Sequence, residues 1–134
     1  MAAPDLTSDA NGRRPAVGVI DGDDGVRQSL ESLLKTLGVT VETFKSAEEF
    51  LERIDRRPLD CLVTEVHLPG MSGIDLQRRL RARAITLPVI VIATEADVAL
   101  AVRAMRLGAL DFIEKPFVER AVLARVRQVL SSGR

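Results

Sequence analysis

Short apolar runs alternate with segments of helical periodicity along most of the chain, and this alternation limits the fold more than any other feature. Five runs enriched in Val, Ile and Leu predict β-strands, at residues 16–20, 39–44, 60–65, 87–93 and 109–114. After each run, apolar residues recur at steps of three and four, which predicts an amphipathic helix. Strands that alternate with helices pair in parallel through right-handed crossovers. The sequence therefore predicts an α/β fold in which helices cover both faces of a five-stranded parallel sheet.

Local signals indicate where the helices begin and which faces they bury. Ser46 with Glu49, and Ser72 with Asp75, have the spacing of a helix-opening cap. For the last two helices the apolar face is expected to carry Val98, Val102, Met105, Leu123, Val126 and Leu130. We expect one domain over residues 16–131, after a flexible polar tail at 1–15 and before a short C-terminal end at 132–134.

Composition excludes several classes of function. Lys plus Arg and Asp plus Glu both number 19, so the chain lacks the basic excess of a nucleic-acid-binding domain and we expect no direct DNA contact. No apolar run approaches the roughly 20 residues of a membrane span, and residues 1–15 do not resemble a signal peptide. The single Cys61 lies in an apolar run and has no internal partner. These features favour a reduced, cytoplasmic protein.

In open parallel sheets, chemistry is concentrated where the strands end at their C-terminal edge. The first strand is followed by Asp21, Gly22, Asp23 and Asp24; the third ends in Glu65; the fourth in Ala93 and Thr94; the fifth in Glu114, Lys115 and Pro116. We therefore expect acidic side chains, a hydroxyl and a lysine to meet at one edge of the sheet.

Four motifs at these strand ends resemble the receiver domain of bacterial two-component response regulators. They are IDGDDGVRQSL, TEVHLPGMSGIDL, the small pair at the end of the fourth strand, and MRLGALDFIEKPF. The resemblance covers about residues 16–131, and the residues of these motifs are most similar to those of receivers of the nitrogen-fixation and nitrate regulator type. It implies a three-layer α/β/α sandwich with a flavodoxin-like strand order, 2-1-3-4-5.

In that family an Asp at the tip of the third strand accepts a phosphoryl group, acids after the first strand bind Mg²⁺, and a Lys contacts the phosphoryl oxygens. Matched by position, the acceptor is Glu65, the first metal-binding acid is Asp21, and the second falls on Gly22. Lys115 is retained. The resemblance also implies a cis peptide bond before Pro116.

Two further positions belong to the switch that reads the phosphoryl group in this family. The hydroxyl position falls on Ala93, with Thr94 one residue late, and the aromatic position is Phe112, which we expect to be fixed inward. His67, two residues after the acceptor, has a loop position that in the family borders the metal; an ordinary solvated histidine is the alternative.

We interpret these departures as a degenerate, or pseudo-, receiver that works without aspartyl phosphorylation. Glu65 is one methylene longer than Asp, and Gly22 offers no ligand. Mg²⁺ binding is accordingly doubted, with Asp21 and Asp24 as weak candidate ligands and no cofactor expected. Glu65 either mimics the charged state through an ion pair with Lys115 or is a solvated relic.

Two alternatives stay open. In one, Glu65 is a working phosphoacceptor, Mg²⁺ is held by Asp21, Asp23 or Asp24, and Lys115 assists. In the other, space left by Gly22 and Ala93 binds a small ligand, although the chain has no Gly-rich phosphate loop.

The expected partners are proteins: a second copy of the chain, a sensor kinase, or a regulator that the domain tethers. A homodimer through residues 97–131 is predicted, because that segment mixes apolar residues such as Leu100 and Val122 with charges of both signs. Arg78, Arg79, Arg81 and Arg83 form either a solvated helix face or an anion-binding patch. The chain is expected to be either a stand-alone protein or the N-terminal part of a longer regulator.

Overall fold

A five-stranded parallel sheet forms the middle layer of the molecule. The computed structural model describes residues 12–94, 98–116 and 119–132. The strands are β1 (Ala16–Ile20), β2 (Thr40–Phe44), β3 (Cys61–Glu65), β4 (Val89–Thr94) and β5 (Asp111–Lys115). Their order is β2-β1-β3-β4-β5, and all four neighbouring pairs are parallel. The predicted fold class and strand order are confirmed.

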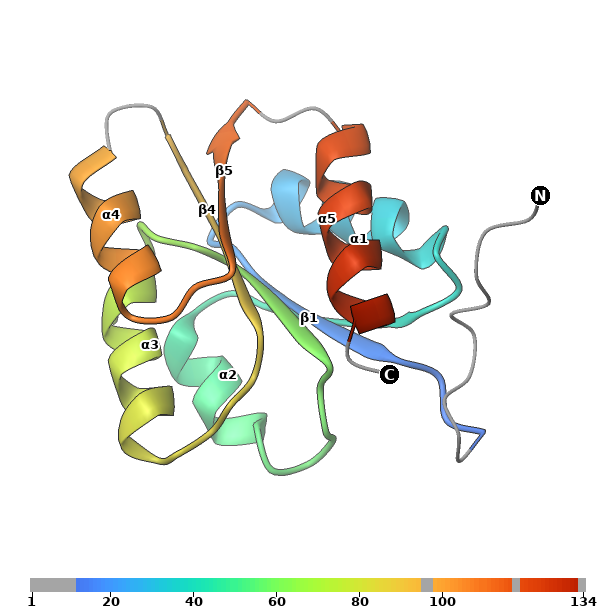
Figure 1. The fold of residues 1–134 in the computed structure, drawn as a ribbon, viewed down its shortest axis with the longest axis horizontal. Helices are drawn as coiled ribbons and strands as arrows, with labels where there is room; N and C mark the ends of the chain where they lie inside the picture. Colours follow the sequence, from blue (N-terminus) through green and yellow to red (C-terminus); the bar gives the residue numbers. More distant parts are fainter. Residues whose placement is uncertain (1–11, 95–97, 117–118, 133–134) are drawn as a thin grey trace.

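Helices cover both faces of the sheet (Figure 1). They are α1 (Asp24–Lys35), α2 (Ala47–Arg53), α3 (Gly73–Ala82), α4 (Val98–Arg106) and α5 (Glu119–Ser132). α1 and α5 lie together on one face, and α2, α3 and α4 lie on the other. This arrangement follows from right-handed crossovers that enter the sheet at β1 and wind toward both of its edges.

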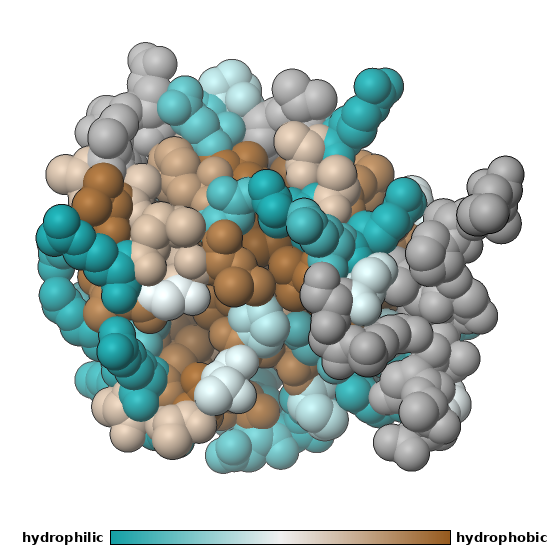
Figure 2. Space-filling model, viewed as in Figure 1, coloured by the Kyte–Doolittle hydropathy of each residue, from teal (hydrophilic) through white to brown (hydrophobic). Residues whose placement is uncertain are grey.

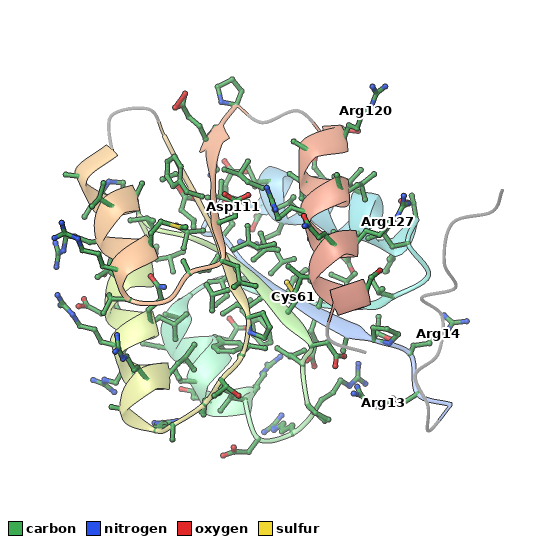
Figure 3. The ribbon with its side chains drawn as sticks, viewed as in Figure 1. Arg13, Arg14, Cys61, Asp111, Arg120 and Arg127 are labelled. Atoms are coloured by element: carbon green, nitrogen blue, oxygen red, sulfur yellow. The ribbon has the colours of Figure 1, made fainter. Side chains whose placement is uncertain are left out.

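Each face of the sheet has its own hydrophobic core. Side chains alternate between the two faces along a strand, so Val17 and Val19 of β1 face α1 and α5, whereas Leu62 of β3 faces the other helices. Cys61 belongs to the α1–α5 side, and Figure 3 shows it inside the molecule. The centre of the sheet is buried on both faces, which explains why β1, β3 and β4 are nearly continuous apolar runs.

The thiol of Cys61 is fully buried and unpaired. Burial, together with the nearby charge of Asp60, raises its pKa to about 12. The thiol therefore stays protonated and acts as a small apolar core group.

The predicted apolar face of α4 is wrong at Val102 and Met105, and the side chain of Val98 lies outside the described part of the structure. Val102 and Met105 are 47% and 44% exposed, whereas Ala101 and Ala104 are buried against the sheet side. The small alanines let α4 approach its neighbours closely, and Leu100 also packs against the core, whereas Val102 and Met105 face outward. On α5, by contrast, Val126 and Leu130 are buried as expected.

The predicted helix starts are correct. Ser46 accepts a hydrogen bond from the Glu49 backbone N–H, and Ser72 accepts one from that of Asp75, each at 3.1 Å. The reciprocal half of the first cap is shifted, because the Glu49 carboxylate accepts from the N–H of Lys45 rather than from that of Ser46. Both caps satisfy donors that a helix N-terminus would otherwise leave unpaired.

In the part of the chain that the structure describes, no helix is long and apolar enough to cross a membrane. The tail expected at 1–15 lies mostly outside the described residues; Pro15, at its end, is buried, and its carbonyl accepts from the Thr40 N–H. Residues 133–134 of the expected C-terminal end also lie outside them.

Candidate functional site

Asp21, Glu65 and Lys115 meet at the C-terminal edge of the sheet. Asp21 follows β1, Glu65 ends β3, and Lys115 ends β5. β4 lies between β3 and β5, so the Lys115 side chain crosses the end of β4 to reach the other two. At this end of β4, Ala93 has only a small, fully buried side chain, which leaves room for the Lys115 side chain to cross. The sequence prediction that these strand ends meet is therefore correct for these three residues.

One ammonium group bridges two carboxylates in this acidic pocket. Nζ of Lys115 donates to Oε2 of Glu65 at 2.7 Å and to Oδ2 of Asp21 at 2.9 Å. The side chains of Lys115, Glu65 and Asp21 are 19%, 12% and 1% exposed, respectively. Water screens such pairs only weakly, so these contacts are stronger than surface ion pairs.

The charges in the pocket shift two pKa values. Burial, supported by the adjacent Asp21 carboxylate, raises the pKa of Glu65 to about 6, and the attraction of Lys115 only partly opposes this rise. Burial alone would lower the pKa of Lys115, but its hydrogen bonds and charge attraction to Glu65 and Asp21 outweigh burial and raise it. Lys115 is therefore fully charged at neutral pH, and the raised pKa of Glu65 brings the ionisation of its carboxyl closer to neutrality.

The other two acids after β1 have structural partners. The Asp23 side chain caps α1 by accepting from the Val26 N–H at 3.0 Å. Asp24 pairs with Arg27. The buried guanidinium of Arg27 also donates to the backbone carbonyl of Asp21 at 2.6 Å, which fixes the turn that carries the Asp21 carboxylate.

These carboxylates do not fit a magnesium ion in the arrangement seen. Mg²⁺ needs carboxylate and water oxygens in a nearly octahedral set. Asp21 and Glu65 are both held by Lys115, Asp24 is held by Arg27, and Gly22 has no side chain. Among the described residues, no three His, Cys, Asp or Glu side chains are grouped as metal ligands. A metal would have to displace a built-in cation.

A close helix contact fixes the end of β3. The Gly73 N–H donates to the Val66 carbonyl at 2.8 Å, so the first residue of α3 lies directly against the β3 terminus. A Cβ atom at position 73 would lie 2.5 Å from the backbone oxygen of Glu65. Only glycine permits this approach.

In the same loop, the Glu48 carboxylate accepts from the Met71 N–H at 3.0 Å, and this bond lowers the pKa of Glu48.

The remaining predicted site residues border the pocket. The peptide bond between Lys115 and Pro116 is cis. Phe112 is partly buried: it packs against the core beneath α4 and also lines a surface hollow beside that helix. His67 is exposed in the loop after β3. Thr94 ends β4, and its side chain lies outside the described part of the structure.

Sequence reasoning missed two buried polar residues, Arg27 and Gln77. Arg27 shares a helix face with Leu30 and Leu34, at steps of three and four, and that spacing was a signal of burial. Gln77 lies three residues before Leu80 and three after Ile74 on α3, again on the buried face. Both were overlooked because polar residues are expected on the solvent side.

Comparison with known proteins agrees with this geometry. The family described as "Response regulator receiver domain" matches residues 17–127. The "Transcriptional regulatory protein FixJ" of Azorhizobium caulinodans is 49% identical over 116 residues, which cover 85% of this chain and 54% of that protein. The "Response regulator protein TodT" of Pseudomonas putida is 38% identical over 88% of this chain and 52% of its own length. The chain thus spans about half the length of these relatives.

Solved structures show the same fold. A response regulator receiver protein from Pseudoalteromonas atlantica superposes with a TM-score of 0.83 at 37% identity, over 90% of this chain and all of that one. The structure titled FixJ-N superposes with a TM-score of 0.81 at 37% identity, over 89% of this chain and 95% of that one. With its five parallel strands in matching order and its sequence matched over most of its length, this chain belongs to the response regulator receiver domain family.

Proposed function

We propose that this chain is a receiver domain that regulates through protein–protein interaction in bacterial signalling or transcription, and that it does so without aspartyl phosphorylation. Receiver domains are regulatory signalling modules. In this chain the Glu65–Lys115 ion pair takes the place of the phosphoryl contact, and the chain catalyses no reaction of its own.

The observation that carries this proposal is the bridging position of Lys115. In receivers, the matching lysine is the cation that meets the phosphoryl oxygens. Here its Nζ already donates to Glu65 at 2.7 Å and to Asp21 at 2.9 Å. A phosphoryl group would have to break at least one of these bonds and enter a pocket that already holds two carboxylates, which costs free energy through like-charge repulsion.

The geometry at the acceptor position also supports the proposal. The carboxylate of Glu65 is one methylene farther from the backbone than that of Asp. A displacement of about 1 Å in a reacting group can cost roughly 10²-fold in rate. Ala93 offers no hydroxyl to bind a phosphoryl oxygen. Relative to a site built around Asp, this pocket therefore holds the acceptor carboxylate one methylene farther out, ties its acids to Lys115, and has Ala at the position expected to carry the hydroxyl.

We further propose that the chain forms a homodimer through residues 97–131. In this region Val102, Met105 and Leu110 are large apolar side chains that are 47%, 44% and 52% exposed. They lie on or after α4, next to the hollow lined by Phe112. Exposed apolar groups of this kind favour a protein interface.

Not every charged residue of segment 97–131 is free to pair with a second copy of the chain. Asp111 already pairs with Arg125 of the same chain, joining β5 to α5; Figure 3 labels Asp111 on β5. Val122 is fully buried and cannot take part, which corrects its placement on the surface. The proposed contact therefore rests on the α4 and β5 apolar groups, with Arg103 and Arg106 beside them.

The test is intact-mass spectrometry after incubation with acetyl phosphate and Mg²⁺, on wild type and on Glu65→Asp. We expect no phosphoryl adduct on wild type. An adduct on Glu65→Asp alone would show that only the acceptor was replaced, and would support Glu65 as a fixed substitute for the charged state. No adduct on either protein would also fit a phosphorylation-independent domain.

An adduct on wild type that maps to Glu65 would overturn the proposal and establish the alternative, a receiver that uses Glu65 as phosphoacceptor. A Lys115→Met variant is the control for chemistry at this site. An adduct that persists unchanged in that variant would point to modification elsewhere on the chain.

A further inference from the structure

We propose that Thr86 is phosphorylated by an arginine-directed serine/threonine protein kinase. Thr86 lies in the connection between α3 and β4, three residues before that strand begins. Because the strands are parallel, this connection lies at the opposite end of the sheet from the acidic pocket of Glu65 and Lys115 (Figure 1). The site is a separate input to the domain, and it does not depend on whether Glu65 accepts a phosphoryl group.

The hydroxyl of Thr86 is accessible in the folded chain. The residue is exposed, and it lines two surface hollows, one of about 580 Å³ and one of about 430 Å³, so it lies on the ridge between them. Neither its side chain nor its backbone groups make a hydrogen bond to any other described residue. A kinase can therefore reach the hydroxyl without first breaking a bond within the chain.

The backbone on either side presents Thr86 to solvent. Residues 85–88 belong to neither a helix nor a strand. The side chains of Ile85 and Leu87 pack against the core, so Thr86 between them faces outward. Leu87 precedes Pro88, and a residue before proline is biased toward extended backbone. An extended stretch with unpaired backbone groups is a form in which a peptide segment enters a binding groove.

Arginines precede Thr86 in a pattern that a kinase can recognise. Arg81 and Arg83 lie five and three residues before it, both are exposed, and neither has an ion pair with another described side chain. Between Asp75 and Glu95 the sequence has four arginines and no acidic residue. Figure 2 shows strongly hydrophilic side chains along the α3–α4 edge of the molecule. Kinases select substrates by such charge patterns, and unpaired guanidinium groups before a hydroxyl complement an acidic groove.

The end of α3 holds the arginines near the hydroxyl. Ala84 has a left-handed φ of 56°, and the N–H of Ile85 donates to the carbonyl of Leu80 at 2.9 Å. This is the hydrogen bond of a Schellman-type helix end, which reverses the chain directly after the last helical turn. The three peptide units from Arg83 to Thr86 span at most about 11 Å. A guanidinium at position 83 is therefore within reach of a phosphoryl group at position 86.

The reaction adds charge beside these arginines. Oγ1 of Thr86 attacks the γ-phosphorus of ATP, the bond from that phosphorus to the bridging oxygen breaks, ADP leaves, and the hydroxyl proton passes to the kinase. A neutral hydroxyl is replaced by a group of about −1.5 to −2 charge at pH 7. Arg81 and Arg83 then bind its oxygens through charge-assisted hydrogen bonds. Asp55 and Asp60, which line the larger hollow with Thr86, repel it, so the phosphoryl group lies toward the end of α3.

The experiment is phosphorylation of the folded full chain by the catalytic domain of protein kinase B, a kinase of this arginine-directed class, with ATP and Mg²⁺. By intact mass and peptide mapping we expect one phosphoryl group, on Thr86. It should survive neutral hydroxylamine, which cleaves an acyl phosphate at Glu65 but leaves a phosphate ester intact. A folded chain that gains no group on Thr86 would overturn the proposal, most directly if a peptide of residues 79–90 is phosphorylated under the same conditions.

Variants test the role of the arginines. Arg81→Gln with Arg83→Gln should lower kcat/KM of the kinase for the chain about tenfold or more. Arg78→Gln with Arg79→Gln removes the same charge one turn earlier on α3 and should change it less than twofold. Equal losses in the two pairs would reduce the recognition to general charge attraction and overturn it. Thr86→Val should gain no phosphoryl group, and an adduct on that variant would assign the modification to another residue.

A ³¹P NMR titration tests how the phosphoryl group is held. The second pKa of a phosphorylated hydroxyl is ordinarily near 6. Arg81 and Arg83 favour the dianion, so we expect this pKa to be lower by at least about 0.5 in the phosphorylated chain and to return toward 6 when both arginines are Gln. A pKa at or above 6 in the phosphorylated wild type would show that Asp55 and Asp60 dominate, and would overturn the contact with the arginines.

Discussion

The ammonium of Lys115 lies 2.7 Å from the carboxylate of Glu65, and this contact joins the last strand of the sheet to its central strand. The same ammonium holds Asp21 after β1. One cation therefore compensates two carboxylates from different strands. The stability of the acidic pocket depends on that cation. Because one positive charge faces two carboxylates, the protonation of Glu65 also depends on the neighbouring charge of Asp21.

Replacement of Lys115 by Ala should destabilise the fold. Without the ammonium, two largely buried carboxylates face each other unpaired, and breaking a buried pair in this way costs several kcal/mol. Because the Lys115 side chain is 19% exposed, we expect a smaller loss, of about 2–3 kcal/mol, in urea unfolding at pH 7.5.

Two variants serve as controls for that loss. Lys35→Ala removes an exposed ion pair with Glu31 on α1 and should cost less than about 0.5 kcal/mol. Lys115→Met keeps the apolar stem and removes only the charge, so it should be nearly as destabilising as Lys115→Ala. If Lys35→Ala and Lys115→Ala cost the same, the bridge contributes nothing.

Stability should depend on pH through Glu65. Its pKa in the folded protein, about 6, lies above its ordinary value of 4.5. The folded state therefore holds this proton more tightly than the unfolded state, and the resulting stabilisation is complete below about pH 4.5 and lost as pH rises through about 6. The unfolding free energy of wild type minus that of Glu65→Gln should fall by about 1 kcal/mol between pH 4.5 and 7.

Urea unfolding of both proteins at a series of pH values measures this difference. Ionisable groups elsewhere in the chain are present in both proteins, so their contributions to the difference largely cancel. A difference that rises with pH over this window would contradict the prediction. It would mean that the attraction of Lys115 stabilises the ionised Glu65 carboxylate by more than burial and repulsion from Asp21 destabilise it. The ¹³C shift of the Glu65 carboxyl gives the pKa independently.

The sequence predicted most of the fold because the strands are short, apolar and bounded by turn residues. Strand ends were placed within one or two residues, and both serine caps were correct. The buried face of α4 was missed, because hydropathy ranks Val102 and Met105 above Ala101 and Ala104. The face of α4 that packs against the sheet carries small side chains, and a pattern of hydrophobicity does not reveal how much space lies between the helix and the sheet.

The candidate site was predicted in part for a similar reason. Asp21, Glu65 and Lys115 could be placed together because strand ends meet at one edge of a parallel sheet. The partners of Asp23 and Asp24 could not, because a carboxylate after a strand serves equally as a ligand, a helix cap or an ion-pair partner. The position of Arg27 inside the fold decides between these roles, and its burial depends on tertiary packing.

Gly73→Ala should destabilise the protein although Ala has the higher helix propensity. The added Cβ would lie 2.5 Å from the Glu65 oxygen and 3.0 Å from the Val66 Cα, both backbone atoms that cannot rotate away. We expect a loss of about 2 kcal/mol in unfolding free energy and a changed NMR shift for Glu65. Gly25→Ala is the matched control, because its Cβ would meet one side-chain oxygen, Oδ1 of Asp23 at 3.2 Å, instead of backbone atoms; a cost equal to that of Gly73→Ala would argue against the close contact.

Cys61 should be unreactive in the folded protein. The thiol is fully buried and its pKa is about 12, so neither access nor ionisation favours attack on a disulfide reagent. With Ellman's reagent at pH 8, we expect one thiol to react promptly in 8 M urea and almost none in buffer. Fast reaction in buffer would show that β3 opens easily, contrary to its central place in the sheet.

The proposed homodimer predicts that a charge on α4 keeps the chains apart. Met105 is 44% exposed and borders the hollow lined by Phe112, so Met105→Glu would place a carboxylate in the centre of the apolar contact. Sedimentation equilibrium should show a concentration-dependent dimer for wild type and a monomer for Met105→Glu. Ala82→Glu adds the same charge at an exposed position on α3 and should leave the dimer unchanged. Loss of the dimer in both variants would assign the effect to net charge, and a wild type that is monomeric at all concentrations would refute the dimer itself.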